Sequence, residues 1–292
     1  MAFEIANTEE IIQSKWMSLF IALVMSFLVL IIAWTRNFFK QFGTAQFVKI
    51  RGWNVIVGFG LFLLFQILMV PLFISLVSKA LWGAAADQEL NVPLVRNWIN
   101  FFLIIGGCTG SALAFFTLNR SQRQFLVGKQ KYADFLLGVA SWFLIYPLML
   151  FLSQGISLLV WYIFHQTFEE QVVVQNLRKI MEHPILFGLT GLSIITIVPL
   201  SEEFLFRGLL QNWLKDKLGS SFAITLTSIV FAFFHFSTDI GISNIELISS
   251  LYVLSWMLGY LFERQQSLWA SVGLHSIFNL ISLLMIIYVP KN

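Results

Sequence analysis

The sequence is poor in charged residues. Only 11% of its 292 residues are Asp, Glu, Lys or Arg, whereas 58% are hydrophobic. A soluble domain has about 25% charged residues, so this chain has too little polar surface to cover a water-facing globule. The charges also occur in short clusters between long apolar runs, which is the pattern of a membrane protein.

Cysteine and clustered basic charge are also scarce. The one cysteine, Cys108, lies in an apolar run, which excludes an internal disulfide and any metal site built from several cysteines. The net charge is only +3 and there is no basic stripe, so we expect no nucleic-acid partner. The first segment has three acids before its first base, Lys15. That charge is wrong for a secretory signal, so we expect the first apolar run to remain as a helix.

Eight apolar stretches are long enough to cross a bilayer, which requires roughly 20 residues. They cover approximately residues 16–35, 54–77, 98–118, 134–164, 185–213, 220–237, 245–262 and 267–288. We predict an all-α, polytopic integral membrane protein with about eight transmembrane helices. The chain shows no internal repeat, low-complexity tract or loop of domain size, so we treat residues 1–292 as a single membrane domain.

Basic residues predict the orientation of these helices, because cytoplasmic loops are enriched in Lys and Arg. Twelve of the 18 basic residues lie around or after the ends of the first, third, fifth and seventh stretches, or eleven if Arg207 is counted as intramembrane, and six occupy the termini and the other loops. This asymmetry predicts that both termini lie outside the cytoplasm. We expect a multi-pass protein of the plasma (inner) membrane.

The fifth apolar stretch differs from the others because it contains Glu202, Glu203 and Arg207. Ionisable groups inside membrane helices cost about 2.5–3.5 kcal/mol each and usually serve a function. Glu203 and Arg207 are four residues apart and can pair on one helix face, whereas Glu202 points about 100° away. Pro199 has no backbone N–H and should open the helix just before the pair. A structural alternative is an interfacial helix that Ser201 caps, with the two glutamates at its positive end.

Two later helices carry histidines. His235 ends the run FAFFH, and His275 and Asn279 lie one turn apart in the last apolar stretch. Polar side chains inside an apolar helix need partners. A structural alternative exists for each: His235 as an interfacial residue, and His275 with Asn279 as a polar contact between helices. The two remaining histidines, His165 and His183, fall in a polar loop, and we expect both to be solvated.

Depth estimates place the polar residues in one layer of the membrane. At 1.5 Å per residue, Glu202 and Asn279 lie about 18 Å from the cytoplasmic ends of their helices. The same arithmetic gives about 12 Å for His275 and about 22 Å for His235. We therefore predict that these four side chains approach one another around a water-accessible cavity.

Such a layer is suited to hydrolysis. A carboxylate in an apolar setting can take a proton from water, and a neighbouring histidine can orient that water. A second histidine and an amide can donate hydrogen bonds to the oxyanion of a tetrahedral intermediate. Glu202, His235 and His275 could instead hold a catalytic zinc with an open position. The chain lacks the HExxH signature that usually accompanies such a metal.

Taken together, the three polar groups resemble a known family. EEFLFR at 202–207 is similar to a Glu-Glu-x-x-x-Arg motif, FAFFH at 231–235 to Phe-x-x-x-His, and HSIFN at 275–279 to His-x-x-x-Asn. In this order, on three late membrane helices, they are the signatures of the CPBP family. That family comprises CAAX proteases and bacteriocin-processing enzymes and is also called Abi. The resemblance covers about residues 185–288, which would form the catalytic core.

The resemblance implies an intramembrane endopeptidase with a defined set of catalytic residues. By position, Glu202 would activate water with His235 beside it, and His275 and Asn279 would stabilise the oxyanion. The family is commonly described as metalloproteases, although a metal-independent glutamate mechanism has also been proposed, so a zinc ion stays an open alternative. Family members cleave prenylated CAAX-type or bacteriocin-related substrates. The implied partner is therefore a membrane-associated peptide or protein in the lipid bilayer.

The two adjacent glutamates are expected to have different roles. Pairing with Arg207 keeps Glu203 ionised and makes it a poor base, so this pair would orient the site. Glu202 lacks that partner and would be the catalytic base. We therefore expect Glu202 to be essential for turnover and Glu203 to be essential for structure.

Two other functions could use the same residues. A transporter or channel would use them as a proton or ion path, but it would often show internal repeats, which this sequence lacks. A non-catalytic membrane scaffold would use them to hold helices together. Cleavage of a membrane-peptide library by the wild type but not by Glu202→Ala would separate the endopeptidase from both alternatives.

Overall fold

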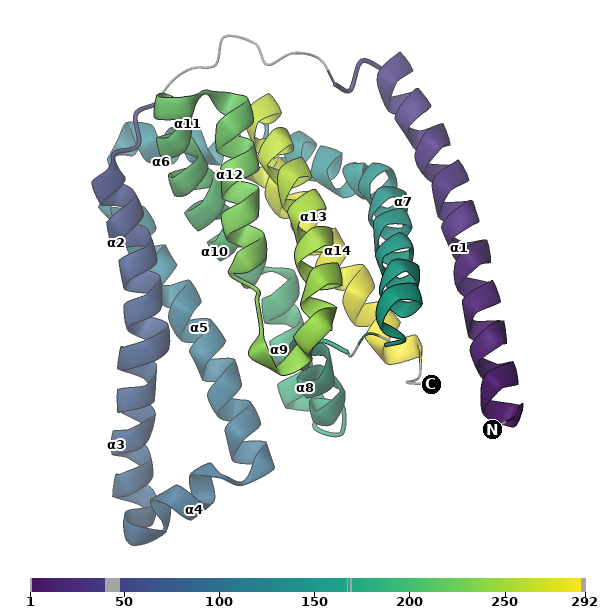
Figure 1. Cartoon of the computed structure of the whole chain (residues 1–292). Coiled ribbons are helices and arrows are strands. Elements are labelled where there is room, and N and C mark those ends of the chain that lie inside the picture. The colour runs from purple at the N-terminus through teal and green to yellow at the C-terminus, as the bar shows by residue number, and fades with distance from the viewer. Residues whose placement is uncertain (1, 40–47, 167, 169, 290–292) are drawn as a thin grey trace.

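The fold is entirely helical wherever the chain is described. The computed structural model describes residues 2–39, 48–166, 168 and 170–289, and all regular elements in these ranges are helices (Figure 1). The elements are α1 (Ala2–Thr35), α2 (Gly52–Leu63), η1 (Leu64–Met69), α3 (Val70–Trp82), η2 (Gly83–Ala85), α4 (Ala86–Leu90), α5 (Pro93–Thr117), α6 (Arg120–Val127), α7 (Lys131–Phe164), α8 (Val172–Ile180), α9 (Pro184–Ile195), α10 (Ile197–Glu203), η3 (Phe204–Gln211), α11 (Asn212–Leu218), α12 (Ser220–Phe233), η4 (Thr238–Ser243), α13 (Asn244–Gln265) and α14 (Leu268–Tyr288). The predicted all-α fold class is confirmed.

Among the described residues, seven helical stretches are long and apolar enough to cross a membrane, so the chain is an integral multi-pass membrane protein. They are Gln13–Thr35, Gly52–Leu90, Pro93–Thr117, Lys131–Phe164, Pro184–Leu218, Thr238–Gln265 and Leu268–Tyr288. The sixth predicted stretch, 220–237, forms only the 14-residue helix α12, which ends at Phe233. Our expectation of a full-length span there is wrong, because the chain turns at Phe234 and His235, directly after the helix. Beyond this turn the Asn244 side chain bonds to the backbone N–H and carbonyl of Ser237.

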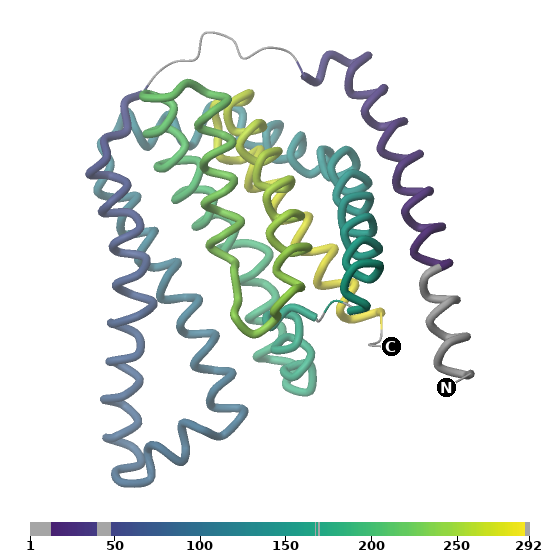
Figure 2. Tube along the Cα trace, viewed as in Figure 1, coloured from purple at the N-terminus to yellow at the C-terminus, as the bar shows by residue number. Residues whose placement is uncertain are grey.

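The C-terminal helices form the centre of the bundle. α14 packs against α7, α9, α10 and α13, while α12 packs against α13 and η3. α1 lies at one edge against α7, and α2, α3 and α5 form an arm at the opposite edge (Figures 1 and 2). α1 begins and α14 ends at the same end of the bundle (Figure 1), as an orientation with both termini on one side requires. Which side that is stays a prediction, and two of the basic residues that we counted, Lys40 and Lys291, lie outside the described residues.

The fifth span is a broken helix. α9 ends at Ile195, and Thr196 (φ −117°, ψ −73°) separates it from α10. Pro199 lies three residues further on and cannot donate to a preceding carbonyl, so the predicted opening just before the glutamates is confirmed. After Glu203 the span continues as the π-helical segment η3. π-Helical segments are rare in proteins, and those that do occur often lie at functional sites.

Candidate active site

The centre of the site is an ion pair with no solvent exposure. Arg207 Nη1 donates to Glu203 Oε1 over 2.9 Å, and both side chains are 0% exposed. The predicted pairing of these two residues is therefore found. The guanidinium also lies over the ring of Phe231, with Cζ 4.7 Å from the ring centroid. Its second nitrogen, Nη2, donates to the Oγ of Ser255 over 2.6 Å and to the Ser255 carbonyl over 3.1 Å. A buried charge is tolerated only when it is paired in this way.

His275 joins the two glutamates. Its Nδ1 lies 2.9 Å from Glu203 Oε1, the same oxygen that accepts from Arg207. A carboxylate that is paired with Arg207 accepts hydrogen bonds, so Nδ1 of His275 is the donor in this contact, and in a neutral ring Nε2 would then be an acceptor. Nε2 lies 3.7 Å from Glu202 Oε2. Glu203 therefore orients His275 as well as Arg207, which the sequence did not predict.

The two adjacent carboxylates have different surroundings. The Glu202 side chain is 22% exposed, whereas that of Glu203 is 0% exposed. Glu202 faces Nε2 of His275 at a distance too long for a direct hydrogen bond. Glu202 is thus the carboxylate that an incoming molecule can reach.

His235 lies just beyond the end of α12. It is two residues past Phe233, the last residue of the helix, and it is half-buried. Its Nδ1 is 2.8 Å from the carbonyl of Phe231, and the two rings are 4.8 Å apart. The Phe231 ring in turn lies 6.0 Å from that of His275. The ring of Phe231 therefore connects His235 to the rest of the site.

Asn279 holds the broken helix. Its Nδ2 donates to the carbonyl of Ile194 over 2.8 Å, at the C-terminal end of α9. The last carbonyls of a helix have no partner inside the helix, and the break at Thr196 creates such an end. Asn279 therefore fixes α14 to the point where the fifth span changes direction.

This contact predicts a structural cost for removing the Asn279 amide. Asn279→Ala should lower the free energy of unfolding by about 1–3 kcal/mol, because the Ile194 carbonyl loses its partner in an apolar setting. The measurement is thermal unfolding in detergent. Ser282→Ala on the same helix is the control, since that hydroxyl bonds only to the Phe278 carbonyl of its own helix. Unchanged stability together with lost catalysis would instead favour the oxyanion role.

The alternative zinc site would need Glu202, His235 and His275 as its ligands. Within the described ranges, no three His, Cys, Asp or Glu side chains are arranged so that they could hold a metal ion. Glu202 and His275 face each other, but His235 packs against Phe231. The described residues thus hold no preformed set of three metal ligands, so we derive no catalytic step through a metal, and whether one is required stays a prediction.

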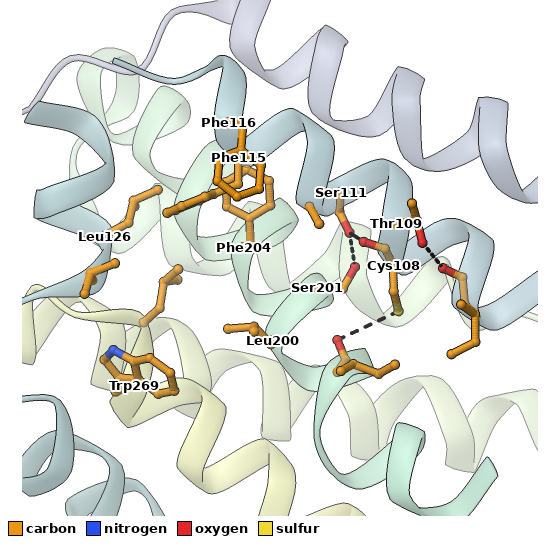
Figure 3. A pocket seen from close by; sticks show the side chains of 15 residues that line it. Cys108, Thr109, Ser111, Phe115, Phe116, Leu126, Leu200, Ser201, Phe204 and Trp269 are labelled. Atoms are coloured by element: carbon orange, nitrogen blue, oxygen red, sulfur yellow. Dashed lines mark hydrogen bonds between the residues drawn. The ribbon is translucent and has the colours of Figure 1, made fainter. Parts of the chain in front are cut away.

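An apolar cavity of about 460 Å³ has Ser201 and Phe204 in its wall, on either side of the two glutamates in the sequence (Figure 3). Its walls come from α5, α6, α10, η3 and α14, and they include Cys108, Ala112, Phe116, Leu200, Ser201 and Trp269. Ser201 immediately precedes Glu202, and its hydroxyl is hydrogen-bonded to that of Ser111 on α5. Pockets of this size and apolar character are typical of small-molecule and side-chain binding sites.

Several of these residues could not have been found from the motifs. Ser255 lies in α13, which carries none of the three motifs, and Ser111 lies far from them in α5. The sequence offered one weak signal for them, since a polar residue in an apolar helix needs a hydrogen-bonding partner. The sequence does not identify that partner, because the choice depends on how neighbouring helices are rotated.

A known family matches the segment of the chain that contains the three motifs. Residues 184–281 match the family model described as Rce1-like, type II CAAX prenyl endopeptidase Rce1-like. The resemblance to the CPBP and CAAX protease family is thereby confirmed for this segment, and the match supports a peptidase. No curated protein and no solved structure matches the chain.

Proposed function

We propose that this protein is an intramembrane endopeptidase in which Glu202 activates the attacking water. The observation that carries the proposal is the pair formed by Glu202 Oε2 and His275 Nε2, which face each other at 3.7 Å. Glu203 fixes the ring of His275 from the other side. A carboxylate beside an oriented imidazole is a recurrent arrangement for general acid–base catalysis. The catalytic core would be residues 185–288.

In this mechanism Glu202 and His275 hold one water between them. Two acceptors 3.7 Å apart can each accept one hydrogen of the same water, which leaves its lone pairs facing the substrate. As the water oxygen bonds to the carbonyl carbon of the scissile peptide, Glu202 takes one proton and the carbonyl oxygen becomes an oxyanion. Glu202 then gives that proton to the amide nitrogen as the C–N bond breaks. The products are a carboxylic acid and an amine.

This proposal changes the role that the family resemblance gave to His275. With its Nδ1 hydrogen donated to Glu203, the neutral ring cannot donate from Nε2 to an oxyanion. We assign it instead to holding the water beside Glu202. Asn279, whose amide bonds to the Ile194 carbonyl, would act by shaping the site.

The cavity beside Ser201 supports a substrate that carries a long apolar group. We propose a membrane-associated peptide or protein substrate, either prenylated and CAAX-like or bacteriocin-like, in the plasma membrane. The experiment is cleavage of a panel of lipid-modified and unmodified peptides by the purified protein, with and without a chelator. Cleavage that persists with the chelator supports the glutamate mechanism. A chain that cleaves no peptide of the panel would favour a scaffold or transporter.

Filling the cavity should weaken substrate binding without affecting hydrolysis. Ala112→Trp places an indole in the cavity, so we expect KM to rise about tenfold or more while kcat changes little. Leu113→Trp is the matched control, because Leu113 is exposed on the same helix and does not line the cavity. Equal KM values for the two variants would mean that the substrate binds elsewhere.

A further inference from the structure

Three polar contacts join the fifth span to α13 in a regular series. Arg207 contacts Ser255, Gln211 Nε2 donates to the Gly259 carbonyl over 3.0 Å, and Lys215 pairs with Glu263. The partners of each contact are 48 positions apart, and successive contacts are four residues apart on both helices. We call this series the polar ladder.

The polar ladder fixes the rotation of one helix against the other. A constant offset means that the two segments run parallel, with the same faces in contact over two turns. Gly259 allows the close approach, because a Cβ there would lie 2.7 Å from Gln211 Oε1. The inner contact, at Ser255, is completely buried, whereas Lys215 at the outer contact is 13% exposed in its side chain.

Only the inner contact reaches the site. Ser255 binds Nη2 of Arg207 through both its hydroxyl and its carbonyl. Because a guanidinium is planar and rigid, fixing Nη2 also fixes the direction of Nη1. Nη1 donates to Glu203 Oε1, the oxygen that also accepts from His275.

We propose that Ser255 is a positioning residue of the active site, acting through Arg207 and Glu203 on the ring of His275. The kinetic part of this proposal rests on the proposed function. The hydroxyl holds the guanidinium so that Glu203 keeps its oxygen on Nδ1 of His275, which keeps Nε2 available as an acceptor towards Glu202. The outer contacts of the ladder stabilise the helix pair and do not set the state of the ring.

The test compares Ser255→Ala with a matched buried serine. Ser228→Ala is the control, because Ser228 is equally buried and its hydroxyl bonds only to a carbonyl of its own helix. We expect Ser255→Ala to lower kcat about tenfold with KM unchanged, the loss of one hydrogen bond to a charged group. Ser228→Ala should leave both constants near their wild-type values. Equal effects of the two variants on kcat would overturn the proposal.

A spectroscopic measurement makes the test independent of activity. The chain has four histidines, so the ring nitrogen signals of ¹⁵N-histidine-labelled protein can be assigned with a His275→Gln variant. We expect wild-type His275 to carry its hydrogen on Nδ1 and Ser255→Ala to give a mixture of both tautomers. Lys215→Met, at the outer contact, should lower the melting temperature without changing the tautomer.

The kinetic and the spectroscopic measurements distinguish failure of the proposed function from failure of the positioning role of Ser255. If the wild type cleaves no peptide but Ser255→Ala shifts the tautomer, the proposed function fails and the positioning role stands. If the tautomer is the same in the wild type and in Ser255→Ala, the positioning role fails whatever the activity. A tautomer shift in Lys215→Met would also contradict it, because the effect would then belong to the whole ladder.

Discussion

Glu202→Gln should reduce peptide cleavage by at least about 100-fold, the usual contribution of a general base, while the protein still folds and binds substrate. The amide has nearly the same shape as the carboxylate but cannot take a proton from water. Glu202 is 22% exposed and forms no ion pair with Arg207, so its charge is not required by the buried network. The measurements are single-turnover cleavage, substrate binding and the melting temperature of the same preparation.

The appropriate control is a glutamate outside the site. Glu182 is exposed in the segment before α9, so Glu182→Gln removes one negative charge without touching the buried network. It should cleave like the wild type. If Glu202→Gln retained near-normal cleavage, Glu202 would not be the base, and the assignment of the two glutamates would have to be reversed.

Glu203→Gln should chiefly destabilise the protein. It leaves the charge of Arg207 without a counter-ion at a position with no solvent exposure. Breaking a buried pair by removing one partner typically costs about 3–5 kcal/mol. We expect a lower melting temperature and yield, and a fall in cleavage that follows from the loss of structure. The measurement is thermal unfolding in detergent beside cleavage at a temperature where the variant is folded.

A double variant separates stability from catalysis. Glu203→Leu combined with Arg207→Met removes both charges and leaves no unpaired ion, so it should be more stable than Glu203→Gln alone. Cleavage should stay low, because the acceptor of His275 Nδ1 is gone. An active double variant would show that His275 does not need Glu203, and a Glu203→Gln protein that is stable but inactive would point to a direct catalytic role.

The spans and the ion pair could be predicted because each depends on neighbours along the chain. Apolar runs of about 20 residues are sufficient to indicate helices in a membrane. The four-residue spacing of Glu203 and Arg207 is sufficient to indicate a pair on one helix face. The break before α10 followed from Pro199 alone.

The rest of the site depends on how helices are rotated against one another. The contact between His275 and Glu203 joins positions 72 residues apart, and nothing in either motif sets the angle between α14 and the fifth span. The π-helical turn of η3 changes which residues face inward after Glu203. Local spacing also failed at His235, because α12 ends at Phe233 and His235 lies in the turn that follows.

Because α5 forms one wall of the cavity, the residues that line the cavity and the residues proposed to cleave the substrate lie in different parts of the chain. The residues proposed to carry out hydrolysis lie in the last third, but Cys108 and Ala112 line the cavity from a helix near the middle. The C-terminal helices alone would leave that side of the cavity facing lipid. Substitutions in α5 could therefore alter which molecules are cleaved without touching the residues that cleave them, and exchanging this one helix between related proteins is a direct way to redesign their selectivity.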